Sequence, residues 1–208
     1  MSPFSKELLR KSVHLSELFI IGGYTFLHFT FSPRTGVLAL TGFLLLLLAI
    51  EFIRVDYKTP ISHQINNTFF RLLNLRKHER DNVTGAIFLV ISTIIVFAAF
   101  DYPIALLALL FTTVGDLAAA IMGMAFGTTK IFRNKSYVGT LSGLIVNIIM
   151  SYLILPDYPE IFLPMAITAS MVEMLTQKLD DNLTVPLFSG FIGQLIVSLG
   201  GFILPALF

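Results

Sequence analysis

The chain of 208 residues contains no cysteine and little charge. The lack of cysteine excludes disulfide bridges, thiolate metal ligands and thiol nucleophiles. Charged residues make up 13% of the chain and hydrophobic residues 55%. This charged share is about half that of an average soluble domain, and the mean hydropathy is +0.82. Together these values predict an integral, multi-pass membrane protein.

Several familiar motifs are also absent. The sequence has no GxxxxGK[ST] loop, no GxGxxG pattern and no HExxH pattern, so the common soluble nucleotide-binding folds are unsupported. The formal net charge of +1 gives no sign of nucleic-acid binding, and we expect no nucleic-acid partner.

Apolar segments long enough to cross a bilayer predict an all-α helical bundle. They lie at about 12–31, 35–53, 84–100, 102–125, 138–156, 159–177 and 185–206. We therefore expect a single domain over residues 1–208 with about seven transmembrane helices. If the N-terminus is cytoplasmic, all of the 14 basic residues except Arg34 are cytoplasmic, as the positive-inside rule requires. A six-helix alternative, with 159–177 at the membrane interface, stays open.

Three cytoplasmic connections are expected, at about 54–83, 126–137 and 178–184. The first carries a helical pattern, because Thr59 can cap a helix that begins at Pro60 and apolar residues then recur at helical spacing. The pattern predicts an amphipathic helix in the headgroup layer. The alternative is a helix that covers the protein's own cytoplasmic face.

Ionisable residues in or beside the apolar segments gather near one side of the predicted bundle. An ionisable group at membrane depth is costly, so each is a candidate for function. The set is His14, Glu17, Glu51, Asp116, Glu173, Asp180 and Asp181. A cytoplasmic substrate could reach this side, whereas an ion pathway would scatter polar groups through the full depth. For Glu51 the alternative is snorkelling beside Arg54, and for His14 it is helix packing.

The segment 115–140, GDLAAAIMGMAFGTTKIFRNKSYVGT, places an acid, several glycines and three basic residues in an apolar chain. Lys130, Arg133 and Lys135 precede a helix predicted to begin near Gly139, and a helix start attracts anions. We interpret this as a polyphosphate site, with Asp116 as a nearby metal ligand. The alternatives are a plain positive-inside loop and glycines that serve only close helix packing.

The segment 173–187, EMLTQKLDDNLTVPL, supplies oxygen ligands. Glu173, Gln177 and Asp180 are predicted on one helical face. Pro186 is predicted in the first turn of the last helix, with Asp181 or Asn182 as its cap. Such a density of carboxylates and amides suits Mg²⁺ held between protein and phosphate.

Five segments in order carry a resemblance to a known family. They are RKSVHL (10–15), ERDNVTGA (79–86), GDLAAAIMGMAFG (115–127), KSYVGTLSG (135–143) and VEMLTQKLDDNLTVPL (172–187). This order resembles the CTP-dependent membrane lipid kinases, which include dolichol kinase, phytol kinase and yeast-type diacylglycerol kinase. The resemblance extends more distantly to phosphatidate cytidylyltransferase. Two positions depart from the family pattern, Met124 in place of a frequent basic residue and Val138 in place of a frequent acid.

The resemblance implies transfer of the γ-phosphoryl group of CTP, with Mg²⁺, to the hydroxyl of a lipid alcohol at the cytoplasmic face of the bilayer. The acceptor would be a polyprenol, a phytol-type prenol or diacylglycerol. Arg10, Lys11, Asp116 and Gly123 match family positions tied to activity. The oligomeric state stays open, a homodimer included.

From this resemblance and the local chemistry we assign roles to individual residues. The expected catalytic residues are Asp116, Lys135, Glu173, Asp180 and Asp181, with Asp116 and Asp181 as Mg²⁺ ligands and Glu173 or Asp180 as the general base. The expected phosphate and nucleotide contacts are Arg10, Lys11, Arg80, Gly123, Lys130, Ser136, Gly139, Thr140, Asn182 and Thr184. His14 and Glu17 are expected near the lipid hydroxyl.

Two alternative functions remain at this point. A cytidylyltransferase-like enzyme would convert phosphatidate to a CDP-lipid and release pyrophosphate. A small transporter or scaffold would consume no nucleotide.

Overall fold

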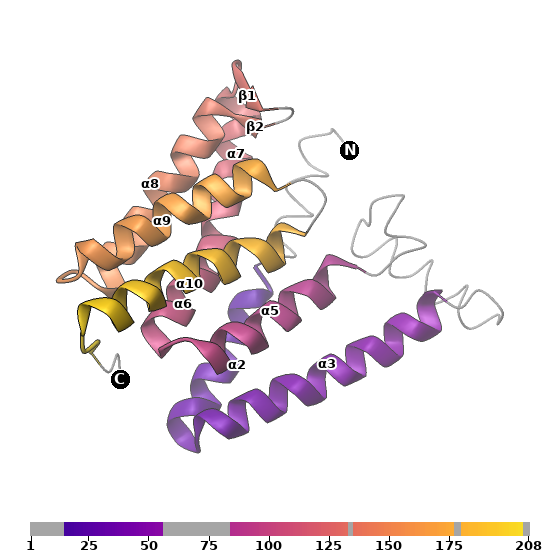
Figure 1. Cartoon of the computed structure of the whole chain (residues 1–208). Helices are drawn as coiled ribbons and strands as arrows, with labels where there is room; N and C mark the ends of the chain where they lie inside the picture. Colours follow the sequence, from indigo (N-terminus) through magenta and orange to yellow (C-terminus); the bar gives the residue numbers. More distant parts are fainter. Residues whose placement is uncertain (1–14, 56–83, 133–134, 177–179, 206–208) are drawn as a thin grey trace.

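The computed structural model describes residues 15–55, 84–132, 135–176 and 180–205 and is helical almost throughout these ranges (Figure 1). Its elements are α2 (Glu17–Thr30), α3 (Pro33–Val55), α5 (Gly85–Ala99), α6 (Tyr102–Leu110), η2 (Phe111–Gly115), α7 (Asp116–Phe126), α8 (Tyr137–Ile154), α9 (Pro159–Leu175) and α10 (Asp181–Gly200). Since α6, η2 and α7 form one continuous helix, the described chain contains seven helical segments, one for each predicted segment. The helix predicted to begin at Pro60 lies outside the described residues.

The helices carry the apolar surface expected of a membrane protein. By length and composition, four of the described helices could cross a membrane: Pro33–Arg54, Tyr102–Phe126, Tyr137–Ile154 and Asp181–Gly200. Large apolar side chains such as Phe19, Phe52 and Leu199 are exposed, which suits contact with lipid. Composition and structure together describe an integral membrane protein. Seven spans and a cytoplasmic N-terminus stay predictions.

Successive helices reverse direction, so the chain ends of the helices fall into two groups (Figure 1). At one end of the bundle α2, α5, α8 and α10 begin and α3, α7 and α9 end. We call this the polar end, because Glu17, Arg54 and Glu173 belong to the helix turns at it, and Asp116 at the start of α7 interacts with Glu17 and Lys135 there. The predicted candidates that the structure describes therefore share one end of the bundle, while Asp101, Asp157 and Glu160 lie at the other end.

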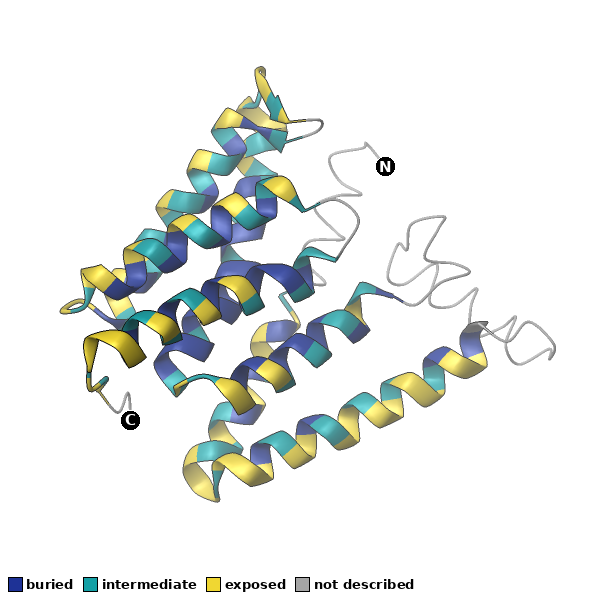
Figure 2. Cartoon of the chain, in the orientation of Figure 1, coloured by how far each residue is buried: buried dark blue, intermediate teal, exposed yellow. Residues whose placement is uncertain are grey.

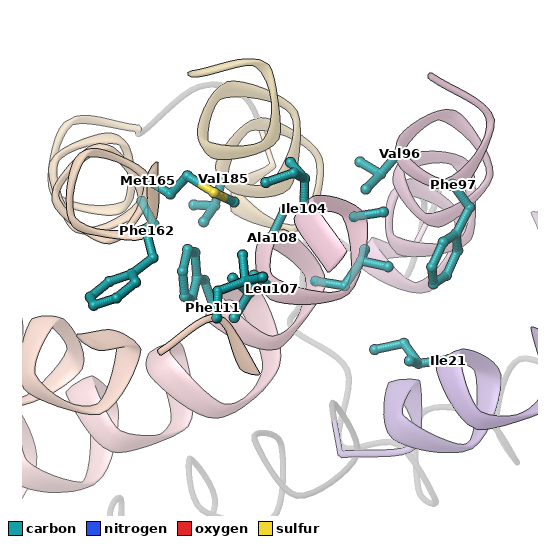
Figure 3. Close-up of a cluster of buried hydrophobic side chains, with 14 of the residues drawn as sticks. Ile21, Val96, Phe97, Ile104, Leu107, Ala108, Phe111, Phe162, Met165 and Val185 are labelled. Carbon is teal, nitrogen blue, oxygen red and sulfur yellow. The ribbon is translucent and has the colours of Figure 1, made fainter. Parts of the chain in front are cut away.

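The apolar core is built around α6, whose side chains at Ile104, Ala105, Leu107, Ala108 and Leu109 have no exposed area. Side chains from α5, α9 and α10 close around this helix, as shown in Figure 3 by Val96, Phe162, Met165 and Val185. Figure 2 shows the contrast with α3, whose outer face is exposed along most of its length. The continuation of α6 through η2 carries Asp116 from this core to the polar end.

Three local predictions need correction. The connection at 126–137 contains an unpredicted antiparallel hairpin, β1 (Lys130–Phe132) with β2 (Lys135–Ser136). The last helix begins at Asp181 rather than near 185, because Asp180 caps it by accepting the N–H of Asn182 at 3.0 Å. Its polar first turn hides this start from a search for apolar residues. Pro186 therefore lies inside α10, beyond its first turn.

Candidate functional site

Asp116 is placed by a π-helical turn. η2 runs from Phe111 to Gly115, and the N–H of Asp116 reaches the carbonyl of Phe111, five residues earlier. Such turns are rare in proteins overall, and those that occur often lie at functional sites. The side chain of Asp116 is 6% exposed, and Thr113 and Gly115 of the same turn are also buried. The sequence singled out Asp116 but gave no signal for the π-turn.

Lys135 and Glu173 form an ion pair across the polar end. Lys135 Nζ donates to Glu173 Oε1 at 2.7 Å, which joins β2 to the last turn of α9. Burial would lower the pKa of Lys135, but the charges of Glu173, Asp116 and Asp181 outweigh burial and raise the pKa above its ordinary 10.5. Lys135 is therefore an ammonium ion that contacts Glu173 and is influenced by the charges of Asp116 and Asp181. We call Asp116, Lys135, Glu173 and Asp181 the acid–lysine cluster.

Glu17 adds a fifth ionisable group beside this cluster. It begins α2, is 1% exposed, and its carboxylate lies beside Thr113 and close enough to Asp116 for the two acids to interact. Neither carboxylate oxygen has a hydrogen-bond partner within the described part of the chain. The structure thus brings Glu17 together with four of the five predicted catalytic residues.

Close packing of α7 on α8 explains two of the predicted phosphate-site glycines. A Cβ added at Gly139 would lie 2.7 Å from the carbonyl oxygen of Ala119 and 3.2 Å from the Cα of Gly123. Ser136 is buried and caps α8 by accepting the N–H of Gly139 at 3.2 Å. Both glycines therefore permit the close helix contact that the packing alternative describes, and their predicted phosphate contact stays a prediction.

The other predicted phosphate-site residues of this region differ in exposure. Lys130 is exposed on the hairpin, and Thr140 is half-buried in the first turn of α8. Of the two departures from the family pattern, Met124 is exposed and Val138 is half-buried. Lys130 is thus accessible on the hairpin, whereas Ser136 and Gly139 are buried where α8 begins and packs against α7.

The start of α10 gathers three further predicted residues. Asn182 and Thr184 are buried, and the hydroxyls of Thr184 and Thr176 are 3.2 Å apart. A Cβ added at Gly85 would lie 3.2 Å from Asn182 Nδ2 and 3.3 Å from Asp180 Oδ2. The start of α5 therefore touches the start of α10. Gly85 was not predicted as a site residue, although it belongs to the ERDNVTGA segment.

The predicted shared face of Glu173, Gln177 and Asp180 was wrong for Glu173 and Asp180. Helix α9 ends at Leu175, and Asp180 caps the next helix instead of continuing α9. Gln177 lies outside the described residues, as do the predicted site residues Arg10, Lys11, His14 and Arg80.

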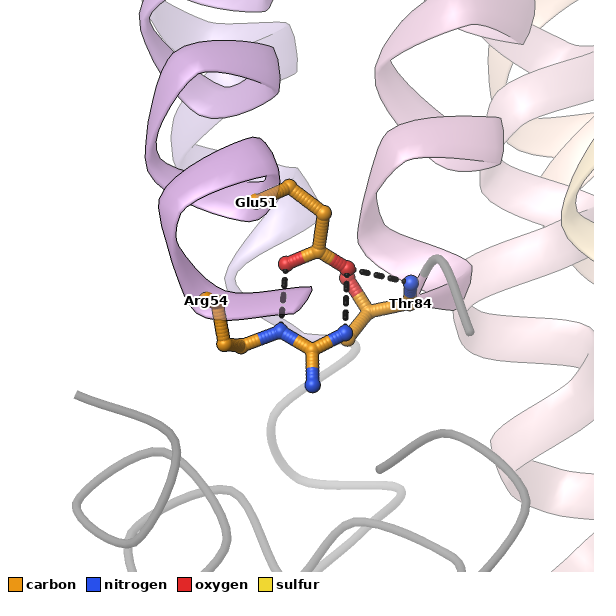
Figure 4. Close-up of polar contacts among 3 residues, drawn as sticks. All are labelled: Glu51, Arg54 and Thr84. Carbon is orange, nitrogen blue, oxygen red and sulfur yellow. Dashed lines mark hydrogen bonds and ion pairs between the residues drawn. The ribbon is translucent and has the colours of Figure 1, made fainter. Parts of the chain in front are cut away.

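Glu51 belongs to a separate, structural contact (Figure 4). Arg54 Nε donates to Glu51 Oε2 at 2.7 Å, and Arg54 Nη2 donates to Glu51 Oε1 at 2.8 Å. The same Oε1 accepts the backbone N–H of Thr84 at 2.6 Å. Arg54 has no exposed area and Glu51 is 6% exposed. The predicted pairing is confirmed, but it is buried and joins the end of α3 to the start of α5.

Comparison with known proteins gives relatives among the lipid kinases. Phytol kinase 1, chloroplastic, of Arabidopsis thaliana is 30% identical over 141 residues, covering 59% of this chain and 46% of that protein. CTP-dependent diacylglycerol kinase 1 of Saccharomyces cerevisiae is 23% identical over 168 residues, covering 64% of this chain and 58% of that protein. The chain is a distant relative of these kinases.

This lipid kinase relationship confirms the resemblance seen in the sequence. The chain spans about half the length of the named kinases that it matches. An uncharacterised protein of Methanocaldococcus jannaschii is 27% identical over 191 residues, covering 90% of this chain and 92% of that protein. No family model matches the chain, and no solved structure matches it.

The acidic side chains in the described ranges do not form a metal site by themselves. Across the described ranges no group of three or more His, Cys, Asp or Glu side chains is placed to hold a metal. Mg²⁺ commonly takes only one or two protein carboxylates and completes its shell with phosphate and water. Asp116 and Asp181 both act on Lys135, and their role as Mg²⁺ ligands stays a prediction.

An apolar groove of about 270 Å³ lies between α2 and α3. Its lining includes Phe19, Ile20, Leu27, Leu40 and Phe43. Phe19 follows Glu17 by two residues in α2, so the groove begins close to the polar end. An apolar lining of this kind suits a lipid tail.

Proposed function

We propose that the protein is a CTP-dependent lipid kinase. It transfers the γ-phosphoryl group of CTP to the hydroxyl of a membrane lipid alcohol. The observation that carries this proposal is the acid–lysine cluster, in which side chains from α7, β2, α9 and α10 interact at one end of an apolar bundle. The names of the relatives support it, since they are a phytol kinase and diacylglycerol kinases.

Phosphoryl transfer depends on positioning and on neutralising charge more than on covalent chemistry by the protein. Lys135 supplies a fixed positive charge, and Lys130 presents a second one on the hairpin. The N-terminal turns of α8 and α10 add the positive ends of two helix dipoles. These groups would bind and orient the triphosphate.

Asp116 and Asp181 would hold Mg²⁺ together with oxygens of the triphosphate. The ion would neutralise charge on the phosphates and align them for transfer. A shared site of this kind needs no third acid from the protein.

The acceptor's tail would lie in the groove between α2 and α3, with its hydroxyl near Glu17. The groove is apolar enough for a polyprenol, a phytol-type prenol or diacylglycerol. The charge bias of the sequence supports a cytoplasmic polar end, where CTP is available. With this orientation the single domain has seven transmembrane helices and a cytoplasmic N-terminus.

In the proposed reaction the acceptor oxygen forms a bond to the γ-phosphorus and the bond to the bridging oxygen breaks, so that CDP leaves. The hydroxyl proton is released. Glu173 holds Lys135 and Asp180 caps α10, so both predicted bases already have structural contacts. A largely dissociative transition state asks little of a base, which lessens the need for either residue in that role.

The test is a transfer assay with the protein purified in detergent. CTP, ATP, GTP and UTP, each labelled in the γ-phosphate, are offered with Mg²⁺ to prenols, phytol and diacylglycerol. We expect label in the lipid with CTP, and CDP as the second product. Absence of labelled lipid with every pair would overturn the proposal. Release of pyrophosphate from CTP with phosphatidate would instead identify a cytidylyltransferase.

A further inference from the structure

Asn147 is a buried polar residue in an apolar helix, and the proposed chemistry gives it no role. It lies within α8 and is 2% exposed. Its Oδ1 has no hydrogen-bond partner in the described part of the chain. A buried amide oxygen without a partner costs free energy, and a polar group at membrane depth is a candidate for function. Stability alone therefore does not explain an asparagine at this position.

The other residues on the same face of α8 are small. Gly139, Gly143, Asn147 and Ser151 follow one another at intervals of four residues, so they share one helix face. Added Cβ atoms at Gly139 and Gly143 would lie 2.7 Å from the carbonyl oxygen and 3.1 Å from the Cβ of Ala119 in α7. Small residues are sufficient for such a contact between membrane helices. Asparagine is larger and more polar than this packing requires.

The side chain of Asn147 lies against the π-turn at Gly115. A Cβ added at Gly115 would overlap Asn147 Oδ1 and would lie 2.9 Å from Asn147 Cγ. Glycine carries only a hydrogen at that place, which leaves room for the amide oxygen. Gly115 and Asn147 therefore fit together as a pair.

Gly115 ends the π-turn and directly precedes Asp116. The turn spans Phe111–Gly115, and the N–H of Asp116 donates to the carbonyl of Phe111. Irregular backbone persists where the surrounding structure holds it in place. The side chain that packs on Gly115 is thus placed to hold the turn, and with it the backbone from which Asp116 projects.

We propose that Asn147 is a positioning residue for Asp116. Its amide occupies the space beside Gly115, holds the π-turn in its irregular form and thereby fixes the direction of the Asp116 side chain. In this role Asn147 needs no contact with a substrate. The effect on catalysis rests on the proposed function, because it requires Asp116 to act in phosphoryl transfer, whereas the effect on the turn does not.

The first measurement follows the π-turn itself and needs no nucleotide. Amide hydrogen exchange of the full chain in detergent is read by mass spectrometry. Asn147→Ala should speed exchange over 111–116 at least about tenfold and leave the core of α6 unchanged. The matched control is Ser151→Ala, because Ser151 is buried on the same face of α8 and its hydroxyl donates to the Asn147 carbonyl within its own helix at 2.7 Å. Unchanged exchange over 111–116 in Asn147→Ala would overturn the proposal.

The second measurement separates positioning from packing. Gly115→Ala should lower the unfolding temperature, because its methyl group overlaps Asn147 Oδ1. Adding Asn147→Ala makes room for that methyl group and should restore the unfolding temperature. In the double variant we expect KM for CTP within about twofold of wild type and kcat lower by at least about tenfold, because the amide that fixes Asp116 is gone. Wild-type kcat in the double variant would show that Asn147 only packs and would overturn its positioning role.

The outcomes also separate this inference from the proposed function. If the wild-type protein phosphorylates no lipid, the kinase proposal fails, while faster exchange in Asn147→Ala would still support the role of Asn147 at the turn. If the wild-type protein is active and exchange over 111–116 does not respond to Asn147→Ala, the inference fails and the kinase proposal stands. If Asn147→Ala does not fold, Asn147→Ser removes less volume and is measured in its place by the same criteria.

Discussion

Lys135 Nζ and Glu173 Oε1 are 2.7 Å apart, which ties the hairpin before α8 to the last turn of α9 across 38 positions of sequence. The side chain of Glu173 is 10% exposed and that of Lys135 is 37% exposed. The pair therefore lies at the edge of the buried region, where it can hold the loop in place and still be reached by a ligand.

The contribution of this pair to stability should depend on pH in a defined direction. The pKa of Lys135 is raised above 10.5 in the folded protein, so the contribution is fully present below pH 10.5 and is lost as pH rises through the folded-state pKa. A double-mutant cycle with Lys135→Met and Glu173→Gln, read by thermal unfolding in detergent, should give a coupling of about 1 kcal/mol or less because water screens Lys135. A coupling unchanged at pH values well above 10.5 would contradict this account.

Asp116→Asn should abolish the proposed phosphoryl transfer while the protein stays folded in the membrane. The amide keeps the size of the side chain but removes the negative charge that the ion and Lys135 require. We expect turnover to fall at least about a hundredfold. The control is Asp157→Asn, since Asp157 is exposed between α8 and α9 at the opposite end. Retained activity in Asp116→Asn would remove this residue from the site.

Gly139→Ala should destabilise the contact between α7 and α8. The new methyl group would lie 2.7 Å from the carbonyl oxygen of Ala119, and neither helix can yield without shifting its neighbours. The expected loss in the free energy of unfolding is about 1–3 kcal/mol. Gly42→Ala is the matched control, because no atom lies within 4 Å of the added Cβ and alanine favours a helix. Equal unfolding temperatures for the two variants would argue against this contact.

Glu51→Ala should destabilise the protein more than removal of both partners of the pair. The single change leaves the guanidinium of Arg54 buried without this carboxylate and removes an acceptor from the N–H of Thr84. Breaking a buried ion pair from one side costs about 3–5 kcal/mol, whereas apolar replacement of both partners is often nearly neutral. The check is thermal unfolding of two proteins under the same conditions, the single variant Glu51→Ala and the double variant Glu51→Leu/Arg54→Met. The single variant should unfold at the lower temperature. A milder effect in the single variant would show that the pair is not a structural link.

The helices could be predicted from the sequence because the residues that contact lipid or the core of a membrane protein are apolar, and so each helix is a long apolar run. The position of Asp116 and Glu173 at one end was predictable because each helix reverses the direction of the last. The partner of Lys135 was not predictable from the sequence, because its position depends on the hairpin. The two strands have only three and two residues, which is too short for a recognisable sequence pattern. The start of α10 was not predictable either, because the first turn of this helix is polar. The placement of Glu17 beside Asp116 follows from packing between helices distant in sequence.

The π-turn at Phe111–Gly115 has a consequence for the evolution of this helix. A π-turn amounts to one extra residue within an α-helix, so deletion of a single residue there would restore a regular helix. Without a deletion, a regular α-helix over the same residues would turn everything that follows by about 100° relative to α6, because each residue of an α-helix advances by that angle. The core face of α6 would survive, but the acid at 116 would face another direction. Related sequences should therefore keep the π-turn, or lose one residue together with it, for the acid to keep its direction.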